Sequence, residues 1–152
     1  MNINIYSIVK PSKDEYDKII NDLIKSSLKY ATVKNHAIFN KNIAKAQTID
    51  EKKAQQSYTS AYEPYMNSGF NIALDVLGKQ IDSFEFAKYI ENHSTVNFFI
   101  GGAYGFEQKF LKKCDLIISL SKLTYAHKIA TLTLTEQIFR ALCINNNHPY
   151  HK

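Results

Sequence analysis

The stretch Phe98-Phe99-Ile100-Gly101-Gly102-Ala103-Tyr104-Gly105 decides how this chain folds. The short apolar run that leads into it, from Val96 to Ile100, is typical of a buried strand in a parallel sheet. The glycines that follow predict a tight turn, because glycine adopts backbone conformations that other residues avoid. Open α/β proteins bind their ligands just outside the carboxyl ends of such strands. The stretch therefore predicts a ligand site at the end of a central strand.

Strand and helix patterns alternate on both sides of this stretch. This alternation predicts an α/β fold, with a mostly parallel sheet covered by helices on both faces. We expect strands over residues 3–9, 32–39, 70–77, 96–100 and 116–120. We expect helices over residues 13–30, 83–90, 105–113 and 125–145, and a further helix that starts within residues 40–56 and continues to residue 65. The expected N-caps of two of these helices are Ser12, with Glu15 three residues on, and Ser83.

Size and composition fit one domain that spans residues 1–152. The apolar and charged fractions, 45% and 22%, are those of an ordinary globular protein and argue against disorder. The amino end alternates like a strand and lacks the features of a secretory signal. No apolar run approaches the length of a membrane helix, about 18 residues. We therefore expect a cytoplasmic protein that does not bind a membrane.

The charge of the chain suits a nucleic acid without requiring one. A formal net charge of +5 favours a polyanionic partner such as RNA, although many basic proteins have none. The cations are eighteen lysines and a single arginine, Arg140, which is either there by chance or kept as a planar, bidentate donor. Residues 40–56 form either a solvated loop that leads into a helix or a basic surface that faces RNA, because they carry Lys41, Lys45, Lys52 and Lys53.

Neither the cysteines nor the histidines predict a metal site. Cys114 and Cys143 lack C-x-x-C spacing, and we interpret both as buried apolar residues. His127, His148 and His151 lie in the last 26 residues, but no H-x-x-x-H spacing or cysteine partner accompanies them. We therefore expect no metal.

Four blocks in the last third of the chain carry a family resemblance. They are Ile-Gly-Gly-x-x-Gly at 100–105, Leu-Ser-x-Leu-Thr-x-x-His at 120–127, Glu-Gln-x-x-Arg-Ala at 136–141 and His-Pro-Tyr-His-Lys at 148–152. In this order they resemble the RlmH family of SPOUT (α/β-knot) methyltransferases, which act on N3 of a pseudouridine in 23S ribosomal RNA. The resemblance implies an α/β-knot fold with a C-terminal trefoil knot, S-adenosyl-L-methionine as cofactor, a homodimer, and ribosomal RNA in the assembled ribosome as substrate.

The resemblance also decides one local conflict. Thr131-Leu132-Thr133-Leu134-Thr135 alternates with period two, which by itself favours a strand. The family implies a helix over residues 125–145, and the spacing from Glu136 to Leu142 is helical. We expect the helix, because tertiary packing overrides local propensity.

The resemblance implies contacts with the cofactor from three segments. Gly101, Gly102 and Gly105 would let the backbone approach the cofactor, although a tight turn explains them equally well. Leu74, at the end of its strand, would be a further contact. The second cofactor loop would consist of Leu120, Ser121, Lys122, Leu123, Thr124, Tyr125 and Ala126. On the residues alone, core packing explains the leucines as well as a cofactor does.

The same resemblance implies that the end of the chain completes the active site of a partner subunit. His148, Tyr150 and His151 would position the substrate, and His151 is the candidate proton acceptor. Glu136 and Arg140 lie four residues apart. They form either a helical ion pair or a unit in which Glu136 orients Arg140 toward an RNA phosphate.

One departure from the family follows His127. Relatives commonly carry an arginine there, where this chain has Lys128-Ile129-Ala130-Thr131. Lys128 would replace that arginine, or the affinity for RNA would be lower. Two other functions stay open: a SPOUT enzyme for another RNA such as tRNA, and a non-catalytic ribosome-associated factor.

Overall fold

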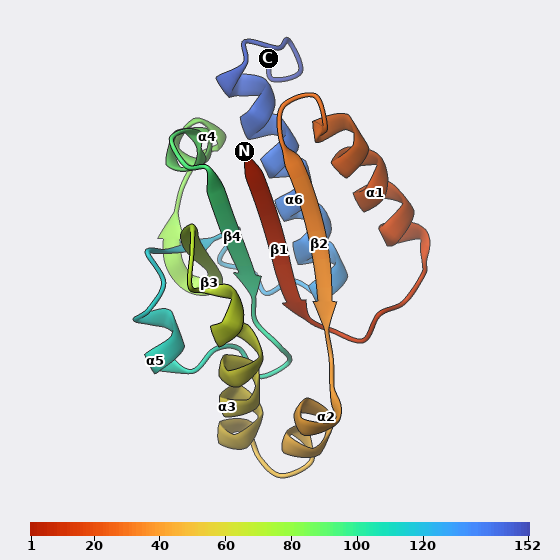
Figure 1. The fold of residues 1–152 in the computed structure, drawn as a ribbon, viewed down its shortest axis with the longest axis vertical. Coiled ribbons are helices and arrows are strands. Elements are labelled where there is room, and N and C mark those ends of the chain that lie inside the picture. Colours follow the sequence, from red (N-terminus) through yellow and green to blue (C-terminus); the bar gives the residue numbers. More distant parts are fainter.

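A computed structural model describes all of residues 1–152. Five strands form one sheet in the order β2-β1-β4-β3-β5, and every neighbouring pair is parallel, which confirms the expected sheet (Figure 1). The strands are β1 (Asn2–Ile8), β2 (Thr32–Ile38), β3 (Phe70–Gln80), β4 (Thr95–Ile100) and β5 (Leu116–Ser119). The helices are α1 (Glu15–Ser27), α2 (Lys41–Gln47), α3 (Glu51–Tyr62), α4 (Ser83–Glu91), α5 (Gln108–Leu111) and α6 (His127–Asn145), with a 3-10 turn, η1, at Glu63–Tyr65.

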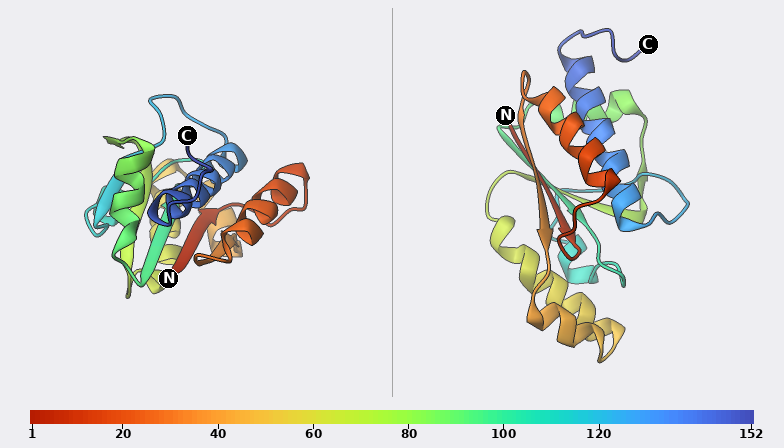
Figure 2. Two further views of the ribbon diagram at one scale, coloured as in Figure 1. Left: turned by 90° about the horizontal axis from the view of Figure 1, so that it is seen from above. Right: turned by 90° about the vertical axis from the view of Figure 1, so that its right-hand side faces the viewer.

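Two apolar clusters, one on each face of the sheet, hold the helices in place. Neighbouring residues of a strand point to opposite faces, so Phe98 and Phe99 of β4 enter different clusters. The Phe98 cluster contains buried residues of α4 and α6, and α1 packs beside α6 on the same face (Figure 2). The Phe99 cluster contains residues of α2, α3 and α5, including the fully buried Tyr58 and Tyr62. The expected helices on both faces are confirmed.

Strand β3 runs further than expected because it contains a bulge. Leu74 pairs with Ile118 of β5, and Lys79 pairs with the same residue after four residues that leave the ladder. A Cβ atom on Gly78 would lie 2.6 Å from the carbonyl carbon of Ile118, so the return of β3 to the sheet requires glycine there. The trefoil knot that the family resemblance implies stays a prediction.

The structure corrects several expected helix boundaries. Asp14, with Asp17, caps α1 in place of Ser12 and Glu15, and Asp82 caps α4 in place of Ser83. A carboxylate stabilises a helix N-terminus by charge as well as by hydrogen bonding, which favours it over a nearby serine. Helix α5 has only four residues. Residues 41–47, expected as part of a loop, form α2, in which Ile43 is buried.

Helix α6 confirms the expectation taken from the family. The threonines that locally favour a strand are accommodated by hydrogen bonds to the preceding turn. The Thr131 hydroxyl donates to the carbonyl of His127 at 2.9 Å, and that of Thr135 donates to the carbonyl of Thr131 at 2.7 Å. None of the helices combines the length and apolar character needed to cross a bilayer.

Candidate functional site

The carboxyl ends of β3, β4 and β5 enclose a cleft of about 280 Å³. This volume is at the lower end of the range for small-molecule sites, roughly 300–1,000 Å³. Three loops and the first turn of α6 line the cleft, because the strand order places β3 between β4 and β5. The cleft is therefore where the opening stretch of sequence predicted a ligand site.

Nine of the eleven residues predicted to contact a cofactor line this cleft. They are Leu74, Gly101, Gly102, Gly105, Leu120, Ser121, Leu123, Thr124 and Tyr125. The other two, Lys122 and Ala126, do not line it. The structure adds residues that were not expected as cofactor contacts: Asp75, Val76, Ile100, Ala103, Phe106, Ser119, His127 and Ala130. Asp75 and Val76 reach the cleft because β3 bulges after Leu74.

Backbone conformation explains Gly105 and packing explains Gly102, without any ligand. The N–H of Gly105 donates to the carbonyl of Gly102 at 2.9 Å, and Gly105 has a φ of +70°, so a tight turn follows β4. A Cβ atom on Gly102 would lie 2.4 Å from the ring of Tyr58. Gly102 is thus needed for the approach of α3, and the resulting turn forms one wall of the cleft.

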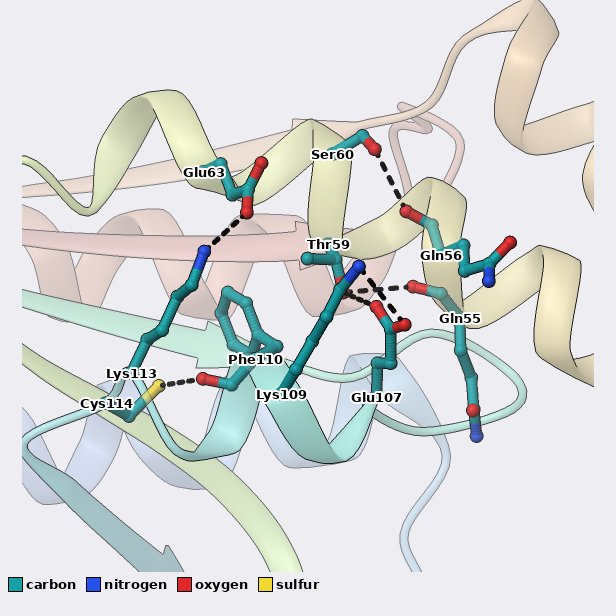
Figure 3. Close-up of polar contacts among 10 residues, drawn as sticks. All are labelled: Gln55, Gln56, Thr59, Ser60, Glu63, Glu107, Lys109, Phe110, Lys113 and Cys114. Carbon is teal, nitrogen blue, oxygen red and sulfur yellow. Dashed lines mark hydrogen bonds and ion pairs between the residues drawn. The ribbon is translucent and has the colours of Figure 1, made fainter.

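Hydrogen bonds from α3 hold this turn in place. The Gln55 amide donates to the carbonyl of Tyr104 at 2.8 Å, and the Tyr62 hydroxyl donates to the carbonyl of Ile100. The Thr59 hydroxyl donates to Glu107 at 2.8 Å, which joins α3 to the residue before α5 (Figure 3). An ion pair at 2.7 Å joins Lys113, which follows α5, to Glu63, which follows α3. The wall of the cleft therefore has a fixed support.

His127 gives the cleft a polar atom with no partner in the chain. It begins α6 and lines the cleft, and its Nδ1 is buried without a hydrogen bond. Burial lowers the pKa of His127, so the ring is neutral at pH 7. Buried polar atoms are nearly always hydrogen-bonded, and no side chain caps the first N–H groups of α6. The uncapped N–H groups of α6 and the apolar side chains that line the cleft fit a bound molecule with polar edges and an apolar face, which is the expected kind of cofactor.

A second group of predicted residues gathers around Arg140. Its Nε donates to Glu136 at 3.0 Å, and the Tyr150 hydroxyl donates to the same carboxylate oxygen at 3.1 Å. The guanidinium lies 4.8 Å from the centre of the Tyr150 ring, and its Nη1 lies 3.2 Å from His151 Nδ1. The hydrogen bond to Glu136 raises the pKa of Arg140. The Glu136–Arg140 ion pair is therefore present, and it also fixes the end of the chain. We call these four residues the Arg140 cluster.

The arrangement at His151 determines its tautomer. Arginine has no acceptor, so Nδ1 of His151 accepts the hydrogen bond and Nε2 carries the proton. In this tautomer the Nδ1 lone pair is used by the bond to Arg140, and Nε2–H is the donor left for a partner. The geometry favours a positioning role for His151 over the expected role as proton acceptor.

His148 does not join the Arg140 cluster. Its main-chain N–H donates to the carbonyl of Cys143 at 2.9 Å, and its ring meets Tyr30 edge-on at 6.3 Å. The structure therefore separates His148 from Tyr150 and His151.

The cleft and the Arg140 cluster lie apart within one chain. Arg140 follows His127 by thirteen residues of α6, which is about 20 Å along the helix axis. At roughly 100° per residue, Glu136 and Arg140 point to the side of α6 opposite His127. Figure 1 shows the end of the chain at the end of the molecule where the strands begin. Within one copy of the chain, the cleft and the Arg140 cluster therefore do not meet.

Lys128 is already paired within the chain. Its ammonium lies 2.7 Å from Asp17 and 3.5 Å from Asp14, both at the start of α1. The hydrogen bond from Lys128 is the main reason that the pKa of Asp17 is lowered. The structure gives this residue a role in joining α1 to α6, rather than a free cation that would replace the missing arginine.

Comparisons with known proteins agree over the whole chain. A family model described as "Predicted SPOUT methyltransferase" matches residues 1–151. The chain is 63% identical over 152 residues to the Ribosomal RNA large subunit methyltransferase H of Aliarcobacter butzleri, with 100% of both chains covered. It is 52% and 49% identical to proteins of the same name from Sulfurovum sp. and Campylobacter concisus, again with 100% of each chain covered. Among solved structures it is similar to the SpoU methyltransferase AviRb of Streptomyces viridochromogenes in complex with AdoMet. That match has 16% identity and a TM-score of 0.47, and it covers 97% of this chain and 61% of that one.

We predict that Gly102→Ala damages the cleft. The new methyl group would displace Tyr58 or the turn, which costs about 1–3 kcal/mol of unfolding free energy. The displaced wall should weaken binding of S-adenosylmethionine about tenfold, which corresponds to about 1.4 kcal/mol. Urea unfolding and calorimetry measure the two effects. Ser60→Ala, at an exposed site on the same helix, serves as the control and should change neither. Binding of wild-type strength in Gly102→Ala would contradict the structure of the turn.

We predict that Lys128→Gln lowers stability by about 0.5–1 kcal/mol at neutral pH. The lowered pKa of Asp17 stabilises the folded chain above the carboxyl pKa of the unfolded state, and this contribution disappears as the pH falls through the folded value. The difference from wild type should therefore shrink in acid. Lys25→Gln, at an exposed lysine of α1 without an ion pair, is the matched control. Unchanged stability at every pH would mean that Lys128 is free for another partner.

Proposed function

This chain belongs to the SPOUT methyltransferase family, and from that premise we propose that it transfers a methyl group from S-adenosylmethionine to N3 of a pseudouridine in large-subunit ribosomal RNA. The observation that supports the proposal most is the cleft, where nine predicted residues from three separate segments meet at the carboxyl ends of the strands. The relatives at 49–63% identity, named for methylation of large-subunit ribosomal RNA, support the class of substrate.

The cleft offers what a bound cofactor of this size requires. When bound, S-adenosylmethionine supplies an electrophilic methyl group on a sulfonium sulfur. Leu74, Leu120 and Leu123 provide apolar walls, while the first N–H groups of α6 provide hydrogen-bond donors. The remaining task of the chain is to hold the substrate nitrogen in line with the methyl group and to assist loss of its proton.

We propose that the Arg140 cluster meets the substrate in the cleft of a second copy of the chain. Glu136 and Arg140 face away from their own cleft. A homodimer is therefore the simplest arrangement that brings an Arg140 cluster to a cleft. Large apolar side chains are exposed at both places. Leu77, Leu123 and Val76 are 90%, 71% and 48% exposed near the cleft, and Phe84 beside His151 is 58% exposed. Exposed apolar surface of this kind is typical of an interface.

In the assembled site, the Arg140 cluster would bind and orient the RNA. Arg140 presents a cation held by Glu136, and its charge suits a phosphate. Tyr150 offers a ring that can flank a base, and His151 offers an Nε2–H donor. We propose the assembled ribosome rather than protein-free RNA as the substrate, in keeping with the basic charge of the chain.

The proposal is tested by transfer of labelled methyl from S-adenosylmethionine to ribosomes, free ribosomal RNA and tRNA from cells that lack this protein. We expect label on ribosomes, and we expect mass spectrometry to map it to N3 of one pseudouridine. Label on tRNA would keep the fold and overturn the substrate. The absence of both label and cofactor binding would favour a non-catalytic ribosome-associated factor.

A further inference from the structure

The hairpin formed by α2 and α3 is a basic surface beside the cleft. Both helices lie beyond the carboxyl ends of β2 and β4, at the same end of the sheet as the cleft (Figure 1). The hairpin exposes four lysines, none of which forms an ion pair: Lys41, Lys45, Lys52 and Lys53. By contrast, Lys109 and Lys113 around α5 are paired with Glu107 and Glu63. Asp50 and Glu51 at the start of α3 are exposed as well, so the net charge of the hairpin is 4 − 2 = +2. The four unpaired lysines are available to a partner.

The hairpin has a fixed position relative to the cleft. Gln47 of α2 donates to the Tyr58 hydroxyl at 2.7 Å, which joins the two helices. Tyr58 packs against Gly102, and Gln55 donates to the carbonyl of Tyr104 at 2.8 Å. The lysines are thus carried by a support that also forms the wall of the cleft, so a ligand bound to them has a defined distance from the reacting position.

The turn that forms one wall of the cleft also carries an exposed aromatic ring. Tyr104 is at the tip of the turn that follows β4, and 42% of it is exposed. The Gln55 amide that donates to the Tyr104 carbonyl also donates to Glu51 at 3.3 Å, and Lys52 lies three residues before Gln55, on the same face of α3. Lysines together with an exposed aromatic ring are typical of surfaces that bind single-stranded RNA.

We propose that the surface formed by Lys41, Lys45, Lys52, Lys53 and Tyr104 binds the RNA strand next to the target nucleotide. This inference rests on the proposed function. A base that reacts in a cleft must leave its stack, so a neighbouring base loses a stacking partner, which the ring of Tyr104 replaces. The lysines bind the phosphates that follow. Charged residues are depleted in the cores of protein interfaces, so these four lysines favour RNA over a protein.

The most direct test places a photo-crosslinking amino acid, benzoylphenylalanine, at position 104 of the full chain and irradiates it with ribosomes. We expect a crosslink to large-subunit RNA within a few nucleotides of the methylated position. The same group at Tyr16, a residue of α1 with a similar exposure of 39%, is the matched control and should not label that region. Crosslinks only to ribosomal protein, or equal labelling from both positions, would overturn the proposal.

A second test compares two quadruple variants with the same change in charge. Lys41, Lys45, Lys52 and Lys53 are replaced by Gln in one, and the exposed Lys13, Lys18, Lys25 and Lys29 in the other. For the hairpin variant, kcat/KM for ribosomes should fall about tenfold or more, and its salt slope should flatten by about 0.7 to 0.9 for each phosphate that a lysine no longer neutralises. Equal effects in both variants would overturn the proposal. Two further measurements distinguish failure of this surface from failure of the proposed function. Calorimetry shows whether the variants still bind S-adenosylmethionine, and mapping of the wild-type product shows which nucleotide is methylated.

Discussion

The packing of Tyr58 and Tyr62 against the end of β4 is the contact on which the site depends. Tyr62 is fully buried and donates to the last carbonyl of the strand, while the Tyr58 ring occupies the space that a side chain at position 102 would need. The turn after β4 is thereby held in one position, and it forms both the wall of the cleft and the support for Tyr104. Gly102 serves this packing, and the turn that it permits forms the wall of the cleft.

Helix α6 imposes the second constraint. Its buried residues face the sheet on the side of His127, so Glu136 and Arg140 have to face outward. The chain then folds back after Asn147, whose φ is +53°, and Tyr150 and His151 reach the outward pair. A cluster of charged and aromatic residues on the outer side of a helix cannot serve its own cleft, but it can serve that of a second copy.

Sequence patterns predicted the sheet, because buried parallel strands appear as short apolar runs such as Val96–Ile100. Helix α6 was predictable only from the family, because alternating threonines favour a strand until their hydroxyls bond to the preceding turn. The bulge of β3 could not be predicted, because its pairing with Ile118 is a tertiary contact and Gly78-Lys79 resembles an ordinary turn. The separation of the cleft from the Arg140 cluster was equally hidden, since both lie in the last third of the sequence.

The central claim is that two copies of the chain share each site, and mixed dimers test it most directly. One parent carries Gly102→Ala, which damages the cleft, and the other carries Tyr150→Ala with His151→Ala, which removes the outward contacts. At S-adenosylmethionine concentrations well below the wild-type Kd, the first parent should keep about a tenth of wild-type activity, and the second should be nearly inactive. Random pairing makes half of the dimers mixed. Each mixed dimer has one intact site out of two, so about a quarter of wild-type activity should return. Mixed dimers that form in sedimentation yet stay as inactive as their parents would contradict the claim.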